Sequence, residues 1–218
     1  KQLGEIVKEV TERVKIEDGD VWLDIACNDG SLLRQVPDNM EKVGIDPADD
    51  SYIAESSKVA TVVQDYFTAD AYQRTGFGDR KAKVVTCIAM FYDLEDPVWF
   101  AREIAKSLAP DGVWHFEQSY MPSMLRTNSY DTICHEHLEF YSFKVIKNLL
   151  ESCDMRVVDV QMNAVNGGSF AVTACKKNAT YRSNTPIINW MLQQEDDMGL
   201  DTPKPYREFE ERVFKHRK

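Results

Sequence analysis

The sequence lacks the features that would place its 218 residues in a membrane, in an oxidising compartment or on nucleic acid. Its apolar runs fall short of the ~20 residues that a membrane-spanning helix needs. Its five cysteines are scattered without C-x-x-C spacing, which favours reduced thiols in a cytoplasmic protein over a disulfide framework. A formal net charge of −10 disfavours a nucleic-acid partner, because phosphate binding requires a basic face.

Secreted and disordered classes are also disfavoured. The opening residues, KQLGEIVKEV, lack the apolar core of a signal peptide. A hydrophobic content of 43% is ordinary for a globular protein, and the length suits one large domain with or without an appendage. We therefore expect a cytoplasmic globular protein.

Strand and helix patterns alternate through the first half of the chain. Runs typical of buried strands lie at 19–26, 41–46, 58–67, 81–91 and 112–120. Helical patterns stand between several of them, and this alternation predicts an α/β fold with a doubly wound parallel sheet. The expected core includes three tryptophans at apolar positions, Trp22, Trp99 and Trp114.

The pattern changes after residue 140. Ser142 is a suitable N-cap for a helix over 143–152. Strands are expected at 155–164 and 170–177, and the Asn-Gly-Gly of 166–168 between them indicates a hairpin. A mostly parallel sheet that ends in an antiparallel hairpin differs from a dinucleotide-binding sheet. It is typical of the Rossmann-like fold of class I methyltransferases.

The loop after the first expected strand is poor in glycine. Its sequence, DIACNDGSLL over 24–33, keeps only Gly30, whereas a dinucleotide-binding loop needs G-x-G-x-x-G to approach a pyrophosphate. Ala26 and Asn28 occupy the other glycine positions of class I methyltransferases. Alanine still permits close approach and asparagine tolerates positive φ, so we expect a tight turn under a ligand without phosphate. S-adenosylmethionine (SAM) is such a ligand.

The next strand ends support SAM as the cofactor. Asp46, in GIDP, can accept hydrogen bonds from ribose hydroxyls, and Asp65 can accept one from the adenine amino group. These aspartates also suit a simpler interpretation as turn formers and caps. Their succession at consecutive strand ends favours the cofactor. The predicted cofactor contacts are Asp24, Ala26, Asn28, Gly30, Asp46, Pro47, Asp65, Tyr66, Ala89 and Met90.

Four segments resemble the bacterial sugar C-methyltransferases, which act on nucleotide-linked keto-deoxysugars. They are DIACNDGSLL, GIDP, YDTICHEHLEFYS (130–142) and NGGSF (166–170). The resemblance implies a SAM-dependent methyltransferase domain, here 1–177, between a small zinc-binding N-terminal domain and a C-terminal domain that this chain would lack. The polar, helical residues 178–218 are then expected to form a linker or tail.

The same resemblance implies roles in the H-E-H cluster. His137 would be the general base that removes the proton beside a keto group, leaving an enolate that takes the methyl group. Glu136 would orient this base or carry the proton. Where the family has a tyrosine, this chain has Cys134, which lacks a comparable hydrogen-bond donor. This departure leaves the substrate and the return of the proton open.

A zinc site is the rival interpretation of the cluster. Cys134, His135 and His137, with His115, are suitable ligands, but a consecutive Cys-His pair cannot readily face one ion. We expect no metal, and expect His135 to support the loop. The expected substrate contacts lie on strand-end loops and are Tyr92, Glu117, Tyr120, Asn128, Cys134 and Asn166.

These observations favour carbon methylation beside the keto group of a small nucleotide-linked sugar. An alternative within the fold is an O-methyltransferase, in which His137 deprotonates a hydroxyl. An alternative of another class is a non-catalytic SAM-fold module that docks a partner domain.

Overall fold

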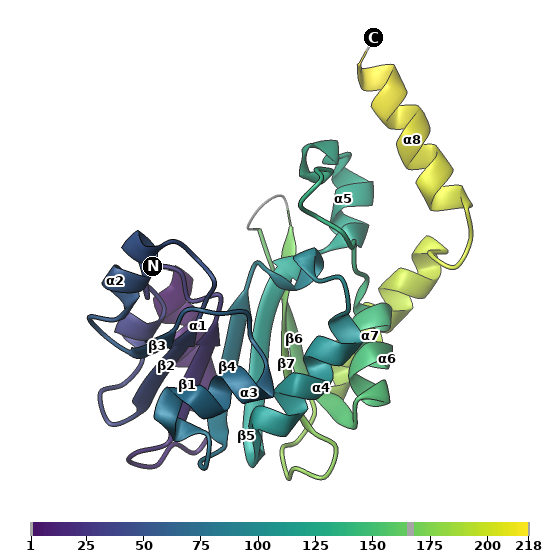
Figure 1. Ribbon diagram of the computed structural model, residues 1–218. Coiled ribbons are helices and arrows are strands. Elements are labelled where there is room, and N and C mark those ends of the chain that lie inside the picture. The colour runs from purple at the N-terminus through teal and green to yellow at the C-terminus, as the bar shows by residue number, and fades with distance from the viewer. Residues whose placement is uncertain (1, 165–167, 218) are drawn as a thin grey trace.

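One sheet organises the computed structural model, which describes residues 2–164 and 168–217 (Figure 1). Within these residues the strand order is β3-β2-β1-β4-β5-β7-β6. Neighbours from β3 to β5 pair in parallel, whereas β7 pairs antiparallel with both β5 and β6. The strands are β1 Val21–Ile25, β2 Glu41–Ile45, β3 Thr61–Val63, β4 Ala82–Ile88, β5 Leu108–Ser119, β6 Met155–Asn163 and β7 Ser169–Lys176. This topology confirms the predicted doubly wound sheet with its antiparallel hairpin.

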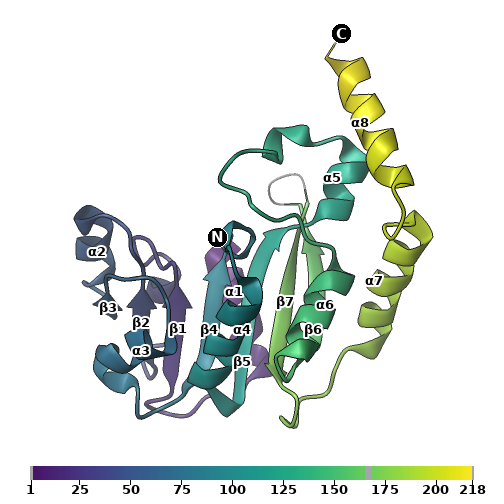
Figure 2. The ribbon, with the colours of Figure 1, turned by 45° about the vertical axis from the view of Figure 1, so that its right-hand side comes forward.

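Helices cover both faces of the sheet (Figures 1 and 2). The α-helices are α1 Gln2–Arg13, α2 Asp50–Ser56, α3 Ala69–Tyr72, α4 Pro97–Ser107, α5 Met121–Thr127, α6 Phe143–Ser152, α7 Thr185–Met198 and α8 Lys204–His216. Short helical turns are η1 Leu33–Gln35, η2 Gln73–Phe77, η3 Phe91–Asp93 and η4 Tyr130–Thr132. Ser142 caps α6 as expected, because its side chain accepts from the Val145 amide. The sequence patterns did not indicate α2, α3 or α5.

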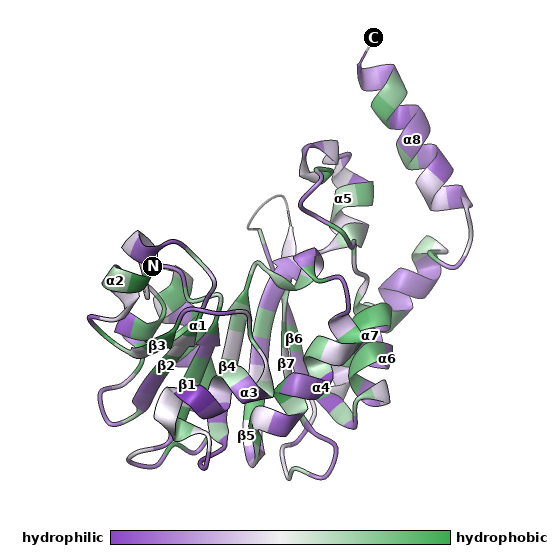
Figure 3. Cartoon of the chain, viewed as in Figure 1, coloured by the Kyte–Doolittle hydropathy of each residue, from purple (hydrophilic) through white to green (hydrophobic). Residues whose placement is uncertain are grey.

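The core has two layers because the central strands are buried on both faces. Leu23 belongs to the layer with Trp114 and α4, whereas its neighbour Trp22 belongs to the layer under α1. Strands buried in this way consist of near-continuous apolar residues, and Figure 3 shows such hydrophobic strands. Trp22 and Trp114 are buried as predicted. Trp99 is 46% exposed, so its expected core position is wrong.

The two last helices differ in their relation to the sheet. Ile188 and Met191 of α7 are buried in the main core, and α7 packs against α6 and β6. In contrast, α8 stands away from the sheet, contacts α5 and is largely hydrophilic (Figures 2 and 3). The domain division expected at residue 177 stays a prediction, with α7 packed as part of the sheet domain. None of the helices in the described ranges is both long and apolar enough to cross a membrane.

Gly44 is expected to be essential for the packing of β2 under the loop after β1. A Cβ at this position would lie 2.6 Å from Cys27 Sγ and 3.3 Å from Cys27 Cβ. Gly44→Ala should therefore lower the free energy of unfolding by about 1–3 kcal/mol, measured by urea denaturation.

Gly4→Ala is the matched control, because Gly4 lies in α1 and its Cβ would meet only the Gln35 side chain, at 3.4 Å or more. This variant should be neutral or more stable by up to about 1 kcal/mol. Equal effects of the two substitutions would contradict the packing argument.

Candidate functional site

The loop after β1 makes the tight turn that its sequence predicted. Ala26, Asn28 and Gly30 all have positive φ, at 58°, 51° and 76°. Asp46 joins this loop to the end of β2: its Oδ2 accepts from the Asn28 amide at 2.7 Å, and its Oδ1 accepts from the Ala48 amide at 2.8 Å. Each carboxylate oxygen can accept a further bond, so Asp46 keeps acceptor capacity for a ligand.

A cavity of about 710 Å³ opens at the carboxyl ends of β1, β2 and β4, and we call it the strand-end cavity. Its volume suits a ligand of cofactor size. Carboxylates of Asp46, Asp93, Glu95 and Asp96 line it beside apolar and aromatic walls. The predicted cofactor contacts that line it are Ala26, Asp46, Pro47, Tyr66 and Met90.

The other predicted cofactor contacts do not line this cavity. Asn28, Gly30 and Ala89 shape its loops through positive φ. Asp24 is buried in β1 and accepts from the Thr86 hydroxyl at 2.6 Å. Asp65 accepts from Arg74 at 2.5 Å and from the Tyr66 amide, and its expected adenine contact stays a prediction.

Trp99 is a wall of the strand-end cavity that the sequence interpretation assigned to the core. It stands in the first turn of α4, where the Asp96 carboxylate accepts from its amide at 2.8 Å. Asp96 and Pro97 mark this helix start in the sequence, just beyond the end of β4. That position at the carboxyl edge of the sheet is the signal that could have identified Trp99.

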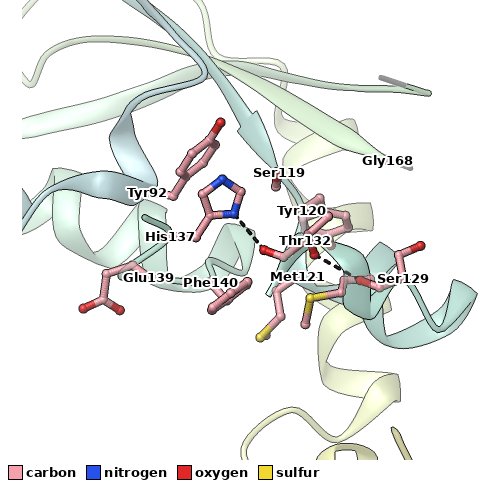
Figure 4. Close-up of a pocket in the computed structure, with 11 residues that line it drawn as sticks. Tyr92, Ser119, Tyr120, Met121, Ser129, Thr132, His137, Glu139, Phe140 and Gly168 are labelled. Carbon is pink, nitrogen blue, oxygen red and sulfur yellow. Dashed lines mark hydrogen bonds between the residues drawn. The ribbon is translucent and has the colours of Figure 1, made fainter. Parts of the chain in front are cut away.

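His137 lies in a separate small pocket, with its ring held on two sides (Figure 4). The ring centroids of His137 and Tyr92 are 4.3 Å apart, and His137 Nδ1 lies 2.9 Å from the Thr132 carbonyl oxygen. Because a carbonyl oxygen only accepts, Nδ1 carries a proton. The neutral ring therefore leaves Nε2 as a proton acceptor.

The turn η3 stands between the two cavities. Tyr92 of this turn lines the His137 pocket, and its neighbour Asp93 lines the strand-end cavity. The Tyr92 carbonyl accepts from the amides of Leu138 and Glu139, each at 3.0 Å, which fastens the residues after His137 to η3. The His137 pocket has a volume of only about 10 Å³, which is about the space that one water molecule needs.

The neighbours of His137 in the cluster are exposed. Glu136 Oε1 pairs with His135 Nε2 at 3.2 Å, and the Thr132 carbonyl takes the orienting contact that was expected of Glu136. Cys134 is also exposed and does not line the His137 pocket. A role of Glu136 in carrying the proton stays a prediction.

The expected substrate contacts are dispersed. Tyr92 and the Tyr120 ring line the His137 pocket, but the Tyr120 hydroxyl donates to Glu195 Oε1 at 2.8 Å. Glu117 is buried within β5 outside both cavities, and Asn128 ends α5 with a φ of 59°. Asn166 lies outside the described residues. Pocket residues that sequence reasoning missed are Ser119, Met121, Met124, Ser129, Thr132, Glu139, Phe140 and Gly168.

His115 takes no part in the H-E-H cluster. It is buried in β5, and its Nδ1 hydrogen-bonds the Thr173 hydroxyl at 2.9 Å. Burial lowers the pKa of His115 to about 4. Among the described residues, no group of three or more His, Cys, Asp or Glu side chains is placed to hold a metal ion.

Comparisons with known proteins point to one enzyme class. A family model described as a methyltransferase domain matches residues 1–160, and one described as a C-methyltransferase C-terminal domain matches residues 164–218. C-methyltransferase NovU of Streptomyces niveus is 30% identical over 210 residues, which cover 95% of this chain and 49% of NovU. The chain thus spans about half the length of this relative.

Solved structures share the fold at low identity. A SAM-dependent methyltransferase from Clostridium acetobutylicum aligns with a TM-score of 0.61 and 12% identity, over 80% of this chain and 91% of that chain. The plantazolicin methyltransferase BpumL in complex with a triazolic desmethylPZN analog and SAH aligns with a TM-score of 0.60 and 12% identity, over 81% of this chain and 84% of that chain. At such identities the likeness shows the fold alone.

Asp24 should make stability depend on pH. Burial raises the pKa of Asp24 to about 7, from about 3.9 in an unfolded chain. Between these two pKa values the folded state keeps a proton on Asp24 that the unfolded state has released. The stability that this proton contributes is lost as pH rises through the pKa of Asp24 in the folded state. Relative to Asp24→Asn, the wild-type free energy of unfolding should fall between about pH 4 and pH 7.

Urea denaturation of both proteins at several pH values measures this difference. Subtracting the free energies of unfolding at each pH cancels the contribution of the titratable groups that both proteins share. Curves that stay parallel over the whole interval would contradict a protonated Asp24.

Proposed function

The chain belongs to the C-methyltransferase family of SAM-dependent enzymes, and from this premise we propose that it methylates carbon. This membership confirms the predicted methyltransferase class and its SAM cofactor. The proposed substrate is a nucleotide-linked sugar with a ketone, methylated at the carbon beside that ketone. The observation that carries the proposal is the hydrogen bond from His137 Nδ1 to Thr132, which leaves Nε2 as a base next to η3.

The strand-end cavity fits SAM. Its four carboxylates favour a cation, such as the sulfonium and ammonium groups of SAM, over a phosphate. Asp46 would accept from the ribose hydroxyls, and Tyr66 and Trp99 offer aromatic faces to the adenine ring. When bound, SAM supplies the electrophilic methyl group that the substrate carbon takes.

His137 would remove the substrate proton. The C–H bond beside the ketone breaks, the proton goes to Nε2, and the electron pair moves to the ketone oxygen as an enolate. The imidazolium that forms keeps its Nδ1–H on the Thr132 carbonyl, and this bond strengthens as the ring gains charge. Asp93 lies within electrostatic range of the ring and would stabilise the same charge.

Tyr92 would take over part of the task of the family tyrosine that Cys134 replaces. Burial raises the pKa of Tyr92, so its phenol stays protonated and can donate a hydrogen bond. It packs directly on the ring of the proposed base. A donor at this position can stabilise the developing enolate oxygen.

Asp46→Asn should weaken SAM binding about 10-fold or more, because one carboxylate oxygen is replaced by an amide donor. Isothermal calorimetry with SAM measures the loss. The control is Asp65→Asn at the next strand end, whose carboxylate pairs with Arg74 outside the cavity and should affect binding less than about 3-fold. A wild-type chain without SAM affinity would favour the docking-module alternative.

His137→Gln should lower methyl transfer, and the exchange of the substrate α-proton in heavy water, by about 100-fold or more. Keto-sugar nucleotides serve as substrates, and NMR detects both the exchange and the methyl product. His135→Gln is the matched control, because the His135 side chain is exposed and pairs with Glu136 on the surface. Its rates should stay within about 3-fold of wild type.

SAM affinity should be unchanged in both variants. Full exchange in His137→Gln would contradict the assignment of the base, and a methyl signal at the position of an O-methyl group would contradict carbon methylation.

A further inference from the structure

His137 belongs to a long excursion from the sheet, residues 121–140, which we call the histidine segment. It leaves after β5 and returns at α6, and its two ends lie close together. The Met121 amide donates to the Tyr141 carbonyl at 3.0 Å across these ends. The position of the base therefore depends on how firmly the two ends are held.

One carboxylate from α7 holds both ends. Glu195 is only 1% exposed. Its Oε1 accepts from the Tyr120 hydroxyl at 2.8 Å, just before the segment, and from the Phe143 amide at 2.6 Å, just after it. Its Oε2 accepts from the Lys144 amide at 2.8 Å. A carboxylate at the start of α6 satisfies amides without helical partners and complements the helix dipole.

Tyr120 connects the Glu195 carboxylate to the His137 pocket. Its ring lines the His137 pocket and packs on Phe170, with centroids 5.0 Å apart. Burial and the Glu195 charge raise the pKa of Tyr120 well above its ordinary value, so its hydroxyl remains a donor to Glu195. The hydroxyl is thus committed to α7, and Tyr120 serves the pocket as a wall.

We propose that Glu195 is a positioning residue, which fixes both ends of the histidine segment so that the His137 ring meets Thr132 and Tyr92. The catalytic consequence rests on the proposed role of His137 as the base. Glu195 lies in the part of the chain that matches the C-methyltransferase C-terminal domain, whereas His137 lies in the part that matches the methyltransferase domain. The C-terminal part therefore sets the geometry of a base that the other part carries.

Glu195→Gln in the full chain tests the clamp, because an amide nitrogen would then face a backbone N–H. The matched control is Asp197→Asn, which removes the same charge from the same helix at an exposed site. Imidazole ¹⁵N NMR reads the ring directly, with the His137 signals assigned through His137→Gln. Wild type and control should show the Nδ1–H tautomer, and Glu195→Gln should lose that defined signal.

Kinetics supply the second measurement. In Glu195→Gln, kcat should fall about 10-fold or more while KM and SAM affinity change less than about 3-fold, because misplacement of a base affects the chemical step. Tyr120→Phe removes one of the donors to Glu195. It should change the His137 ring signals and kcat in the same direction as Glu195→Gln, but by a smaller amount. Its effect should be smaller still in the Glu195→Gln background, because the two residues share one interaction.

Unchanged His137 ring signals in folded Glu195→Gln would overturn the proposal. If that variant does not fold, unchanged ring signals and kcat in Tyr120→Phe would overturn it instead. The NMR experiment needs no substrate, so it tests the positioning role of Glu195 independently of the proposed function. A wild-type chain with the expected tautomer but without α-proton exchange would refute the base and leave the clamp standing.

Discussion

The parallel pairing of β1 with β2 and β4 is the constraint on which the candidate site depends. It brings three strand ends to one edge of the sheet, where ligands of open α/β sheets bind. The register of Ile25 with Ile45 sets the loop after β1 beside the end of β2, within reach of the Asp46 carboxylate. The same edge carries η3 after β4 and the histidine segment after β5. The strand-end cavity and the His137 pocket thus become neighbours through topology, although their residues lie far apart in sequence.

Local patterns predicted the parts of this site that local chemistry determines. The strand ends follow from apolar runs that stop at an acidic residue, and the positive φ of Ala26 and Asn28 follows from a tight turn without its usual glycines. What the sequence could not indicate is the direction of each side chain. Asp24 turns to Thr86, and Asp65 turns to Arg74, because each partner comes from another element. Partners of this kind are set by packing, so the position of an aspartate at a strand end does not determine where its carboxylate points.

The contact that orients His137 shows a second limit. The family resemblance implied that Glu136, the carboxylate next to His137 in sequence, would orient its ring or carry the proton. The contact comes instead from the backbone carbonyl of Thr132, a group that every residue possesses and no motif records. The bond between Tyr120 and Glu195 is equally hidden, since it joins the residue after β5 to a residue of α7 that lies 75 positions further along the chain. Both contacts involve the histidine segment or its ends, so the interactions that orient His137 in the structure are the least predictable from sequence.

The boundary between the two family matches cannot be a folding boundary. It falls between residues 160 and 164, near the end of β6 and before β7. Yet β7 lies between β5 and β6 and pairs with both, so the first match alone would leave β6 without its neighbour in the sheet. Ile188 and Met191 then bury α7 in the same core. Because β7 and α7 complete one cooperative structure, Glu195 is covalently and energetically part of the unit that holds His137. A clamp from the C-terminal part is therefore a property of the fold itself and requires no docking between domains.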